Sequence, residues 1–242
     1  MEVHAQEFWL PKHGSSTAEY EDASRSRQPR FAVADGATET SFSRIWAKQL
    51  VNAFTRGKLN VPLAPHTLRP LQTRWQEIVR LRPLPWYAEE KAQSGAFAAF
   101  LGLELEVLTD GEQFTPSWKA TAAGDTCLVQ VRGGEVIKKF PLERSDEFGN
   151  RPHLLCSRAD VEVPPVSNCI GDYGCDDAFF LMSDALALWF YSECESGNRP
   201  WEILRDLDTT DARQTFDELI SDLRACHYIK NDDVTLLRID VY

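Results

Sequence analysis

The chain has 242 residues, of which 43% are hydrophobic and 26% charged, a balance typical of a globular protein; this length predicts a single domain over residues 1–242, with two small domains as the alternative. Its formal net charge of −11 would repel a nucleic-acid backbone or an anionic membrane surface, so the sequence excludes both as partners. No apolar run approaches the roughly 20 residues of a membrane-spanning helix, and the first residues lack the pattern of a secretion signal, so we expect a cytoplasmic protein.

The start of the chain predicts a strand that ends in an acid. Residues 1–30 are polar and irregular, which is typical of a surface strand and loop. Residues 31–34 are a short apolar run, FAVA, closed by Asp35 and Gly36. This pattern predicts a buried strand that delivers a carboxylate into a turn.

Two helices are predicted next. Apolar residues recur at helical spacing over residues 42–54, with Ser41 as a candidate N-cap. The same spacing returns over residues 68–79, after a proline-rich stretch, and Pro83 and Pro85 would end that helix.

The middle of the chain changes from helical to strand periodicity. Residues 101–107 alternate between apolar and polar side chains, as in a sheet with one face in water. A further strand is predicted over 118–122, and residues 126–131 and 135–140 flank a Gly-Gly pair, which predicts a β-hairpin. Residues 142–177 show little periodicity and are predicted to form a long irregular loop.

The last third predicts a buried strand over 178–182, a helix over 185–191, a helix over 216–223 and a final strand over 234–241. The order of elements is a strand, two helices, antiparallel strands, helices and a strand. This order favours a layered α+β sandwich over a series of βαβ units.

Carboxylates recur where the short apolar strands end. Asp35 closes one strand, Asp184 closes a second, Asp232 precedes a third, and Glu21 and Asp22 come before the first. If the strand ends converge, these groups would repel one another unless they were protonated or bound to cations. Oxygen ligands suit Mg²⁺ or Mn²⁺, and the five His residues show no zinc spacing. The alternative is that each Asp is only a turn former or a helix cap.

Five short segments together suggest a family. EYEDA, VADGATE, AAGDTCL, LMSDALAL and NDDVTLL resemble, in order, motifs of the metal-dependent Ser/Thr protein phosphatases of type 2C. They span Glu21 to Val241, nearly the whole chain, and indicate a bacterial-type single domain. The resemblance implies an α+β fold with four layers, α-β-β-α, in which two antiparallel sheets are flanked by helices. It also implies a centre with two Mn²⁺ or Mg²⁺ ions at one end of the sandwich.

The same resemblance implies roles for individual residues. Asp35 would bridge both ions and Gly36 would bind one through its carbonyl, while Asp184 and Asp232 would bind the other. Glu21 and Asp22 match acidic positions that hold metal directly or through water. The implied reaction is hydrolysis of phosphoserine or phosphothreonine in a protein by a hydroxide shared between the ions, with Asp35 and Asp22 as catalytic residues.

Several positions depart from the family pattern. Ala185 replaces the usual Gly after the strand-end Asp, and Ala37 stands where some members have a proposed general acid. Thr17 replaces an Arg that grips phosphate in some members, so we assign the substrate phosphate to Lys12, the nearest upstream cation. Asp125 is interpreted as structural. The Asp that binds a third metal ion in many bacterial members cannot be placed in this sequence.

The sequence is compatible with one other function and argues against a second. A catalytically weak or inactive relative could keep the fold and bind a protein partner through the predicted helices that carry Trp75 and Trp86, although core packing also explains such Trp residues. A haloacid-dehalogenase-type enzyme lacks support, because Val33 stands where its nucleophilic Asp would be.

Overall fold

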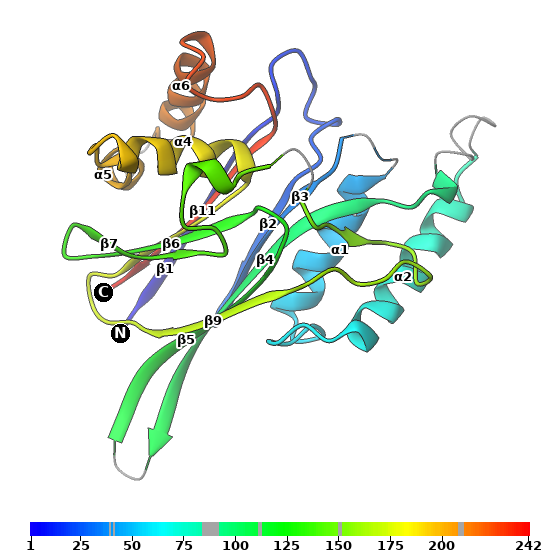
Figure 1. The fold of residues 1–242 in the computed structure, drawn as a ribbon, viewed down its shortest axis with the longest axis horizontal. Helices are drawn as coiled ribbons and strands as arrows, with labels where there is room; N and C mark the ends of the chain where they lie inside the picture. The colour runs from blue at the N-terminus through cyan, green and yellow to red at the C-terminus, as the bar shows by residue number, and fades with distance from the viewer. Residues whose placement is uncertain (39, 41, 84–91, 111–112, 150–151, 208–210) are drawn as a thin grey trace.

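Two antiparallel β-sheets lie face to face at the centre of the molecule, with helices on the outer side of each (Figure 1). This structure is a computed structural model that describes residues 1–242 except 39, 41, 84–91, 111–112, 150–151 and 208–210. The predicted four-layer α+β sandwich is confirmed. No helix in the described part of the chain is long and apolar enough to cross a membrane.

The first sheet has the strand order β1-β11-β10-β6-β7. Its strands are β1 (Val3–Leu10), β6 (Cys127–Arg132), β7 (Glu135–Phe140), β10 (Ala178–Met182) and β11 (Val234–Val241). The predicted Gly-Gly hairpin joins β6 to β7. β10 and β11 are buried along their whole length, because the second sheet covers one face and helices cover the other.

The second sheet has the order β2-β3-β4-β5-β9, and β8 pairs with β4. These strands are β2 (Ala23–Arg27), β3 (Arg30–Gly36), β4 (Phe97–Asp110), β5 (Gln113–Ala123), β8 (Leu155–Cys156) and β9 (Ser167–Asp172). The prediction of a long irregular loop over 142–177 is therefore wrong in part, since this segment contains β8, β9 and the 3₁₀ helix η1 (Ser145–Glu147). β9 is a polar strand at the edge of the sheet, held by backbone pairing with β5, so its side chains carry no hydrophobic alternation.

Helices α1 (Ser43–Thr55) and α2 (Pro65–Arg80) pack on the second sheet, and α4 (Asp184–Glu195), α5 (Pro200–Arg205) and α6 (Ala212–Ala225) pack on the first (Figure 1). The N-cap of α1 is Phe42, which has a left-handed backbone and makes no side-chain cap. Ser41, the predicted N-cap, lies outside the described residues. The six-residue helix α5 was not predicted, because it is too short to show a helical period.

The strand β3 shows how the sandwich is filled. Phe31 and Val33 point into the core between the sheets, whereas Ala32 and Ala34 belong to the core beneath α1. Large side chains thus fill the inter-sheet space and small ones let the helix approach closely. By the same alternation, Asp35 follows Val33 onto the inter-sheet side, at the end of the sandwich.

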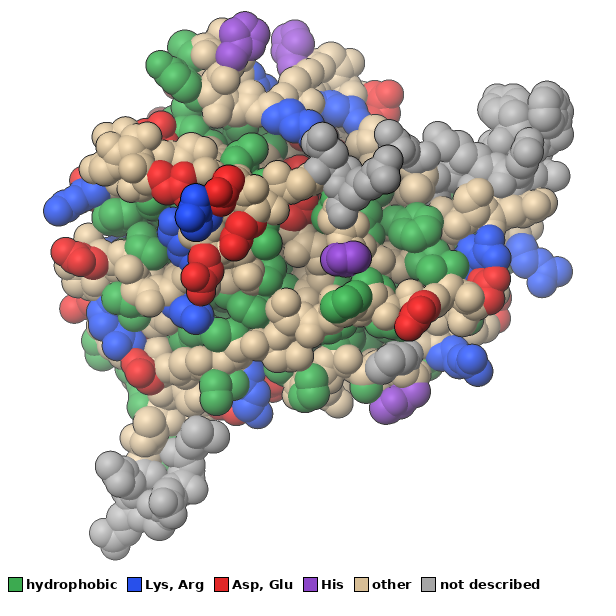
Figure 2. Space-filling view, viewed as in Figure 1, with side chains coloured by type: hydrophobic (Ala, Val, Ile, Leu, Met, Phe, Trp, Pro, Cys, Tyr) green, Lys and Arg blue, Asp and Glu red, His purple; other side chains and the backbone are tan. Residues whose placement is uncertain are grey.

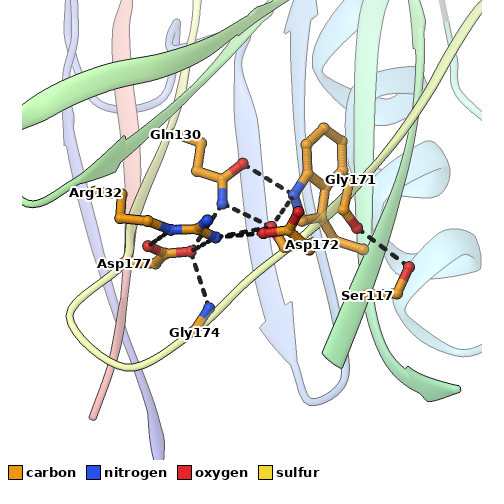
Figure 3. Close-up of polar contacts among 8 residues, drawn as sticks. Ser117, Gln130, Arg132, Gly171, Asp172, Gly174 and Asp177 are labelled. Atoms are coloured by element: carbon orange, nitrogen blue, oxygen red, sulfur yellow. Dashed lines mark hydrogen bonds and ion pairs between the residues drawn. The ribbon is translucent and has the colours of Figure 1, made fainter. Parts of the chain in front are cut away.

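A polar network closes the inter-sheet space at the start of β10 (Figure 3). The fully buried carboxylate of Asp177 accepts hydrogen bonds from Arg132 Nε at 2.7 Å and Gln130 Nε2 at 2.8 Å. Gln130 Oε1 in turn accepts a hydrogen bond from the Trp118 indole at 2.9 Å. Because each buried polar group has a partner, this network stabilises the end of the sandwich opposite Asp184, which follows the other end of β10.

Candidate active site

A cavity of about 540 Å³ opens at the end of the sandwich where β3 and β10 terminate. Its lining includes the side chains of Asp35, Asp125, Asp184, Asp232 and Lys230. These residues come from the end of β3, the turn between β5 and β6, the first turn of α4 and the loop before β11. The structure thus brings four of the six predicted metal ligands, Asp35, Gly36, Asp184 and Asp232, to one cavity.

Two glycines allow this arrangement. A Cβ atom on Gly36 would lie 2.7 Å from the backbone oxygen of Glu21, so only glycine lets the end of β3 pass this close to the acidic segment. Gly124 has a positive φ of 90°, and a Cβ there would lie 2.7 Å from the Cβ of Ala99 on β4. The turn that carries Asp125 can therefore press against the second sheet.

Asp22 lies close to Asp35 but is not among the residues that line the cavity. Its side chain is 1% exposed and accepts a hydrogen bond of 2.6 Å from the hydroxyl of Thr235 on β11. The buried phenol of Tyr20 is also hydrogen-bonded to the Thr235 hydroxyl. Thr235 therefore fixes the Asp22 carboxylate from the neighbouring sheet.

The cluster carries more negative charge than its surroundings neutralise. Burial raises the pKa of Asp35 well above its ordinary value, and the carboxylates of Asp22 and Asp184 raise it further. Burial likewise raises the pKa of Asp22, and burial together with Asp232 raises the pKa of Asp184. The pKa of Asp125 rises to about 7, first through burial and then through Asp184. A bound cation would relieve this repulsion.

Lys230 supplies positive charge inside the cavity. Its Nζ lies 3.1 Å from Oδ2 of Asp232 and 3.9 Å from Oδ2 of Asp184. The Lys230 side chain is 64% exposed, so the ammonium keeps access to solvent while it pairs with both acids. This role could not be predicted from the sequence, because a single Lys in a polar turn belongs to no motif.

The Asp184 carboxylate is not the cap of α4. Ser183 is the N-cap residue, and Asp184 is the first residue of the helix. The Asp184 Oδ1 accepts a hydrogen bond from the backbone N–H of Ala185 at 2.5 Å, and the other oxygen faces Lys230. Ala185 is buried and helical, which suits a helix that begins directly after the strand.

Glu21 and Lys12 lie at the edge of the site. Glu21 directs Oε1 to the hydroxyl of Ser43 at 2.5 Å and Oε2 toward Lys12 Nζ at 3.7 Å, and its side chain is not among those that line the cavity. Lys12 Nζ also lies 3.3 Å from the hydroxyl of Thr38, which does line the cavity. The structure therefore separates Glu21 from the other acids and brings Lys12 to the rim.

Sequence reasoning missed Asp233. Its carboxylate is buried and accepts hydrogen bonds from the backbone N–H of Lys12 at 2.9 Å and of Glu21 at 2.7 Å. Asp233 therefore ties the N-terminal acidic segment to β11. The doublet Asp232-Asp233 was the available signal, since neighbouring residues at a strand end point in different directions.

Asp125, interpreted from the sequence as structural, is among the residues that line the cavity. Burial and then the Asp184 carboxylate raise the pKa of Asp125, so it belongs to the same group of acids. The turn motif alone could not reveal this, because an Asp after Gly is common in turns whatever its side chain faces.

The donor set fits hard divalent cations, because the cavity offers carboxylate oxygens in excess of positive charge. Among the described residues, no group of three or more His, Cys, Asp or Glu side chains lies close enough together to form the ligands of one ion. The fit therefore rests on donor chemistry and on the repulsion that a cation would remove.

Trp75 does not provide an exposed contact for a partner. Its side chain is 2% exposed and packs in the core beneath α1 and α2, with its indole N–H directed to the Phe42 carbonyl at 3.4 Å. The predicted partner surface therefore cannot rest on Trp75, and Trp86 lies outside the described residues.

The chain matches no family model and no curated protein sequence. Solved structures resemble it in fold. The Ser/Thr phosphatase Stp1 from Staphylococcus aureus is 14% identical with a TM-score of 0.63, covering 100% of this chain and 96% of that one. The phosphatase PstP/Ppp of Mycobacterium tuberculosis is 16% identical with a TM-score of 0.60, over 99% and 98% of the two chains. The catalytic domain of PstP in complex with two manganese ions is 16% identical with a TM-score of 0.57, over 99% of each chain.

Proposed function

We propose that this chain, which has the fold of the type 2C Ser/Thr phosphatases, hydrolyses phosphoserine or phosphothreonine in proteins with the help of two Mn²⁺ or Mg²⁺ ions. The observation that carries the proposal is that Asp35, Asp184 and Asp232, from three separate elements, all line one cavity. The structural likeness to PstP with two manganese ions supports the choice of metal.

The residues that would hold the ions follow from the cavity. Asp35 interacts with the carboxyl groups of both Asp22 and Asp184, which supports a role for Asp35 in holding both cations. Asp184 and Asp232 would hold one ion, and Gly36 and Asp22 the other. When bound, such ions lower the pKa of water toward neutrality and neutralise the charge of a phosphate group.

The chain's own residues would orient the substrate and keep the acids in place. Thr235 holds the Asp22 carboxylate by a hydrogen bond, which fixes its free oxygen relative to Asp35. Lys12, at the rim beside Thr38, would bind a phosphate oxygen through its ammonium. Glu21 would act indirectly, since its pairing with Ser43 and Lys12 positions that ammonium.

One observation favours a second function. The Lys230 ammonium already pairs with Asp184 and Asp232, so it partly occupies the site that a metal ion would fill. A chain in which this pairing persisted would keep the fold but bind metal weakly. It would then act as a non-catalytic module that binds a protein partner.

Hydrolysis of phosphoserine and phosphothreonine peptides, measured by phosphate release, separates the two functions. An active phosphatase releases phosphate with millimolar Mn²⁺ and stops when EDTA is added. Absence of turnover with Mn²⁺ and with Mg²⁺, in protein that is folded by circular dichroism, would favour the non-catalytic module.

A further inference from the structure

Positive charge is concentrated on α1, α2 and the loop between them. Residues 43–83 contain eight of the 26 Lys and Arg residues and one of the 37 Asp and Glu residues. The remainder of the chain therefore has a net charge more negative than the −11 of the whole chain. Elsewhere the charges are mixed: acidic and basic side chains intermingle over β6, β7 and α4 (Figure 2). The helical layer over the second sheet is therefore a distinct basic surface.

This surface contains a groove of about 390 Å³ between α1 and α2, here called the basic groove. Its charged lining residues are Lys48, Arg56, Lys58, Arg74 and Arg82. All five are exposed, and within the described part of the chain none of them forms an ion pair. Among the residues that the structure describes, no carboxylate side chain lines the groove. These five cations repel one another, a cost that an anionic ligand would offset.

Gln49 gives an independent indication of a ligand. Gln49 is among the residues that line the basic groove, and among the described residues neither of its amide atoms, Nε2 and Oε1, has a hydrogen-bond partner. Both atoms are buried, and a buried amide without partners destabilises the fold. Once the side chain turns into the groove, a ligand with both donors and acceptors, such as a peptide backbone, would satisfy this amide, whereas a simple anion would satisfy only the N–H groups.

The basic groove continues into a second cavity that lies nearer to the carboxylate cavity lined by Asp35, Asp184 and Asp232. The groove shares Ile45, Lys48 and Arg82 with this second cavity, at the start of α1, whose lining includes Glu21 and Ser43. Gly36 packs against the same Glu21 and Ser43, so this path leads toward the carboxylate cavity. The 13 residues of α1 extend about 20 Å, which matches about six residues of extended peptide.

We infer that the basic groove binds a short acidic segment of a partner protein in extended form. Arg and Lys side chains recognise the carboxylates, and Gln49 bonds to the peptide backbone between them. The site is separate from the carboxylate cavity and does not depend on metal or on phosphatase activity. A protein segment is favoured over nucleic acid because the acidic remainder of the molecule would repel a long phosphate backbone.

Fluorescence anisotropy with a labelled peptide of six Glu residues tests this inference on the full chain in EDTA. Binding should weaken at least tenfold in the variant Lys48→Glu/Arg74→Glu and when salt is raised. A matched control, Arg27→Glu/Arg69→Glu, makes the same change in net charge at exposed cations outside the groove and should lose much less affinity. Gln49→Met should bind the peptide several-fold more weakly while its melting temperature stays equal or rises.

Three outcomes would overturn the inference. One is the absence of saturable binding by the wild type at low salt. Another is equal loss in the groove variant and the control, which would show that only net charge matters. The third is a different occupant: tighter binding of a single-stranded RNA of equal charge, or self-association of the chain that the groove variant abolishes in sedimentation velocity.

Discussion

The Lys230 ammonium lies 3.1 Å from Oδ2 of Asp232, inside a cavity where carboxylates otherwise repel one another. A divalent cation that binds Asp232 must displace this ammonium or share the carboxylate with it. Metal affinity in this chain is therefore expected to reflect a competition with one of its own side chains.

Replacement of that charge should strengthen metal binding. We expect Lys230→Met to raise the affinity for Mn²⁺ about threefold to fivefold, since an exposed ion pair contributes up to about 1 kcal/mol. Lys230→Arg keeps the charge and should bind Mn²⁺ like the wild type. Titration calorimetry of the three proteins measures the effect, and equal affinities in all three would show that Lys230 does not compete.

Asp184 tests the assignment of ligands without disturbing the fold. Because the amide oxygen of Asn can accept the same hydrogen bond from the Ala185 N–H, Asp184→Asn should leave the melting temperature of the metal-free protein nearly unchanged. The loss of a charged ligand should lower Mn²⁺ affinity by at least tenfold. Asp172→Asn, at an exposed carboxylate far from the cavity, is the control. Unaltered affinity in Asp184→Asn would remove Asp184 from the metal site.

Metal should stabilise the folded chain. Ions that bind only the native state at a hundred times their dissociation constant add about 2.7 kcal/mol. For a chain of this size that corresponds to a rise in melting temperature of about 5–10 °C. Scanning calorimetry with Mn²⁺ and with EDTA, at matched ionic strength, measures it. Identical curves would argue against a cation site in the cavity.

The network at the other end of β10 predicts a pH dependence. Burial alone would raise the pKa of Asp177, but hydrogen bonds from Arg132, Gly174 and Gln130 outweigh it and lower the pKa. A lowered pKa in the folded state means that the charged form stabilises the fold above the unfolded pKa of about 3.9. This stabilisation is lost as the pH falls through the folded pKa.

We therefore expect Asp177→Asn to destabilise the protein by about 1–3 kcal/mol at pH 7, with the difference from the wild type shrinking below about pH 4. Urea unfolding at several pH values measures this. Asp172→Asn, which removes an exposed partner of the same Arg132, should cost less than about 1 kcal/mol. A cost for Asp177→Asn that does not change with pH would contradict the assigned cause.

The sequence predicted the features that repeat along a strand or helix. The apolar run before Asp35 forms a strand buried on both faces, so its pattern was visible and the position of Asp35 at its end followed. The same holds for the strand before Asp184. Both acids could therefore be assigned to a shared site before the topology was known.

Features that depend on long-range contacts were not predictable. β9 forms because β5 offers it an edge, and its own residues show no alternation. Lys230, Asp125 and Asp233 gain their roles only when turns distant in sequence meet, and each stands in a turn where its residue type is common. Glu21 illustrates the converse, because its motif was visible but its side chain faces Ser43 and Lys12.

Substitution of Asp35 probes whether the carboxylate cavity is the metal-dependent phosphatase centre proposed above. The measurement is phosphate release from a phosphothreonine peptide by wild type and Asp35→Asn at saturating Mn²⁺, with the fold of both verified by circular dichroism. We expect turnover by the wild type and at least a thousandfold loss in Asp35→Asn, since a neutral amide cannot serve two cations. Near wild-type, manganese-dependent turnover in folded Asp35→Asn would contradict that proposal.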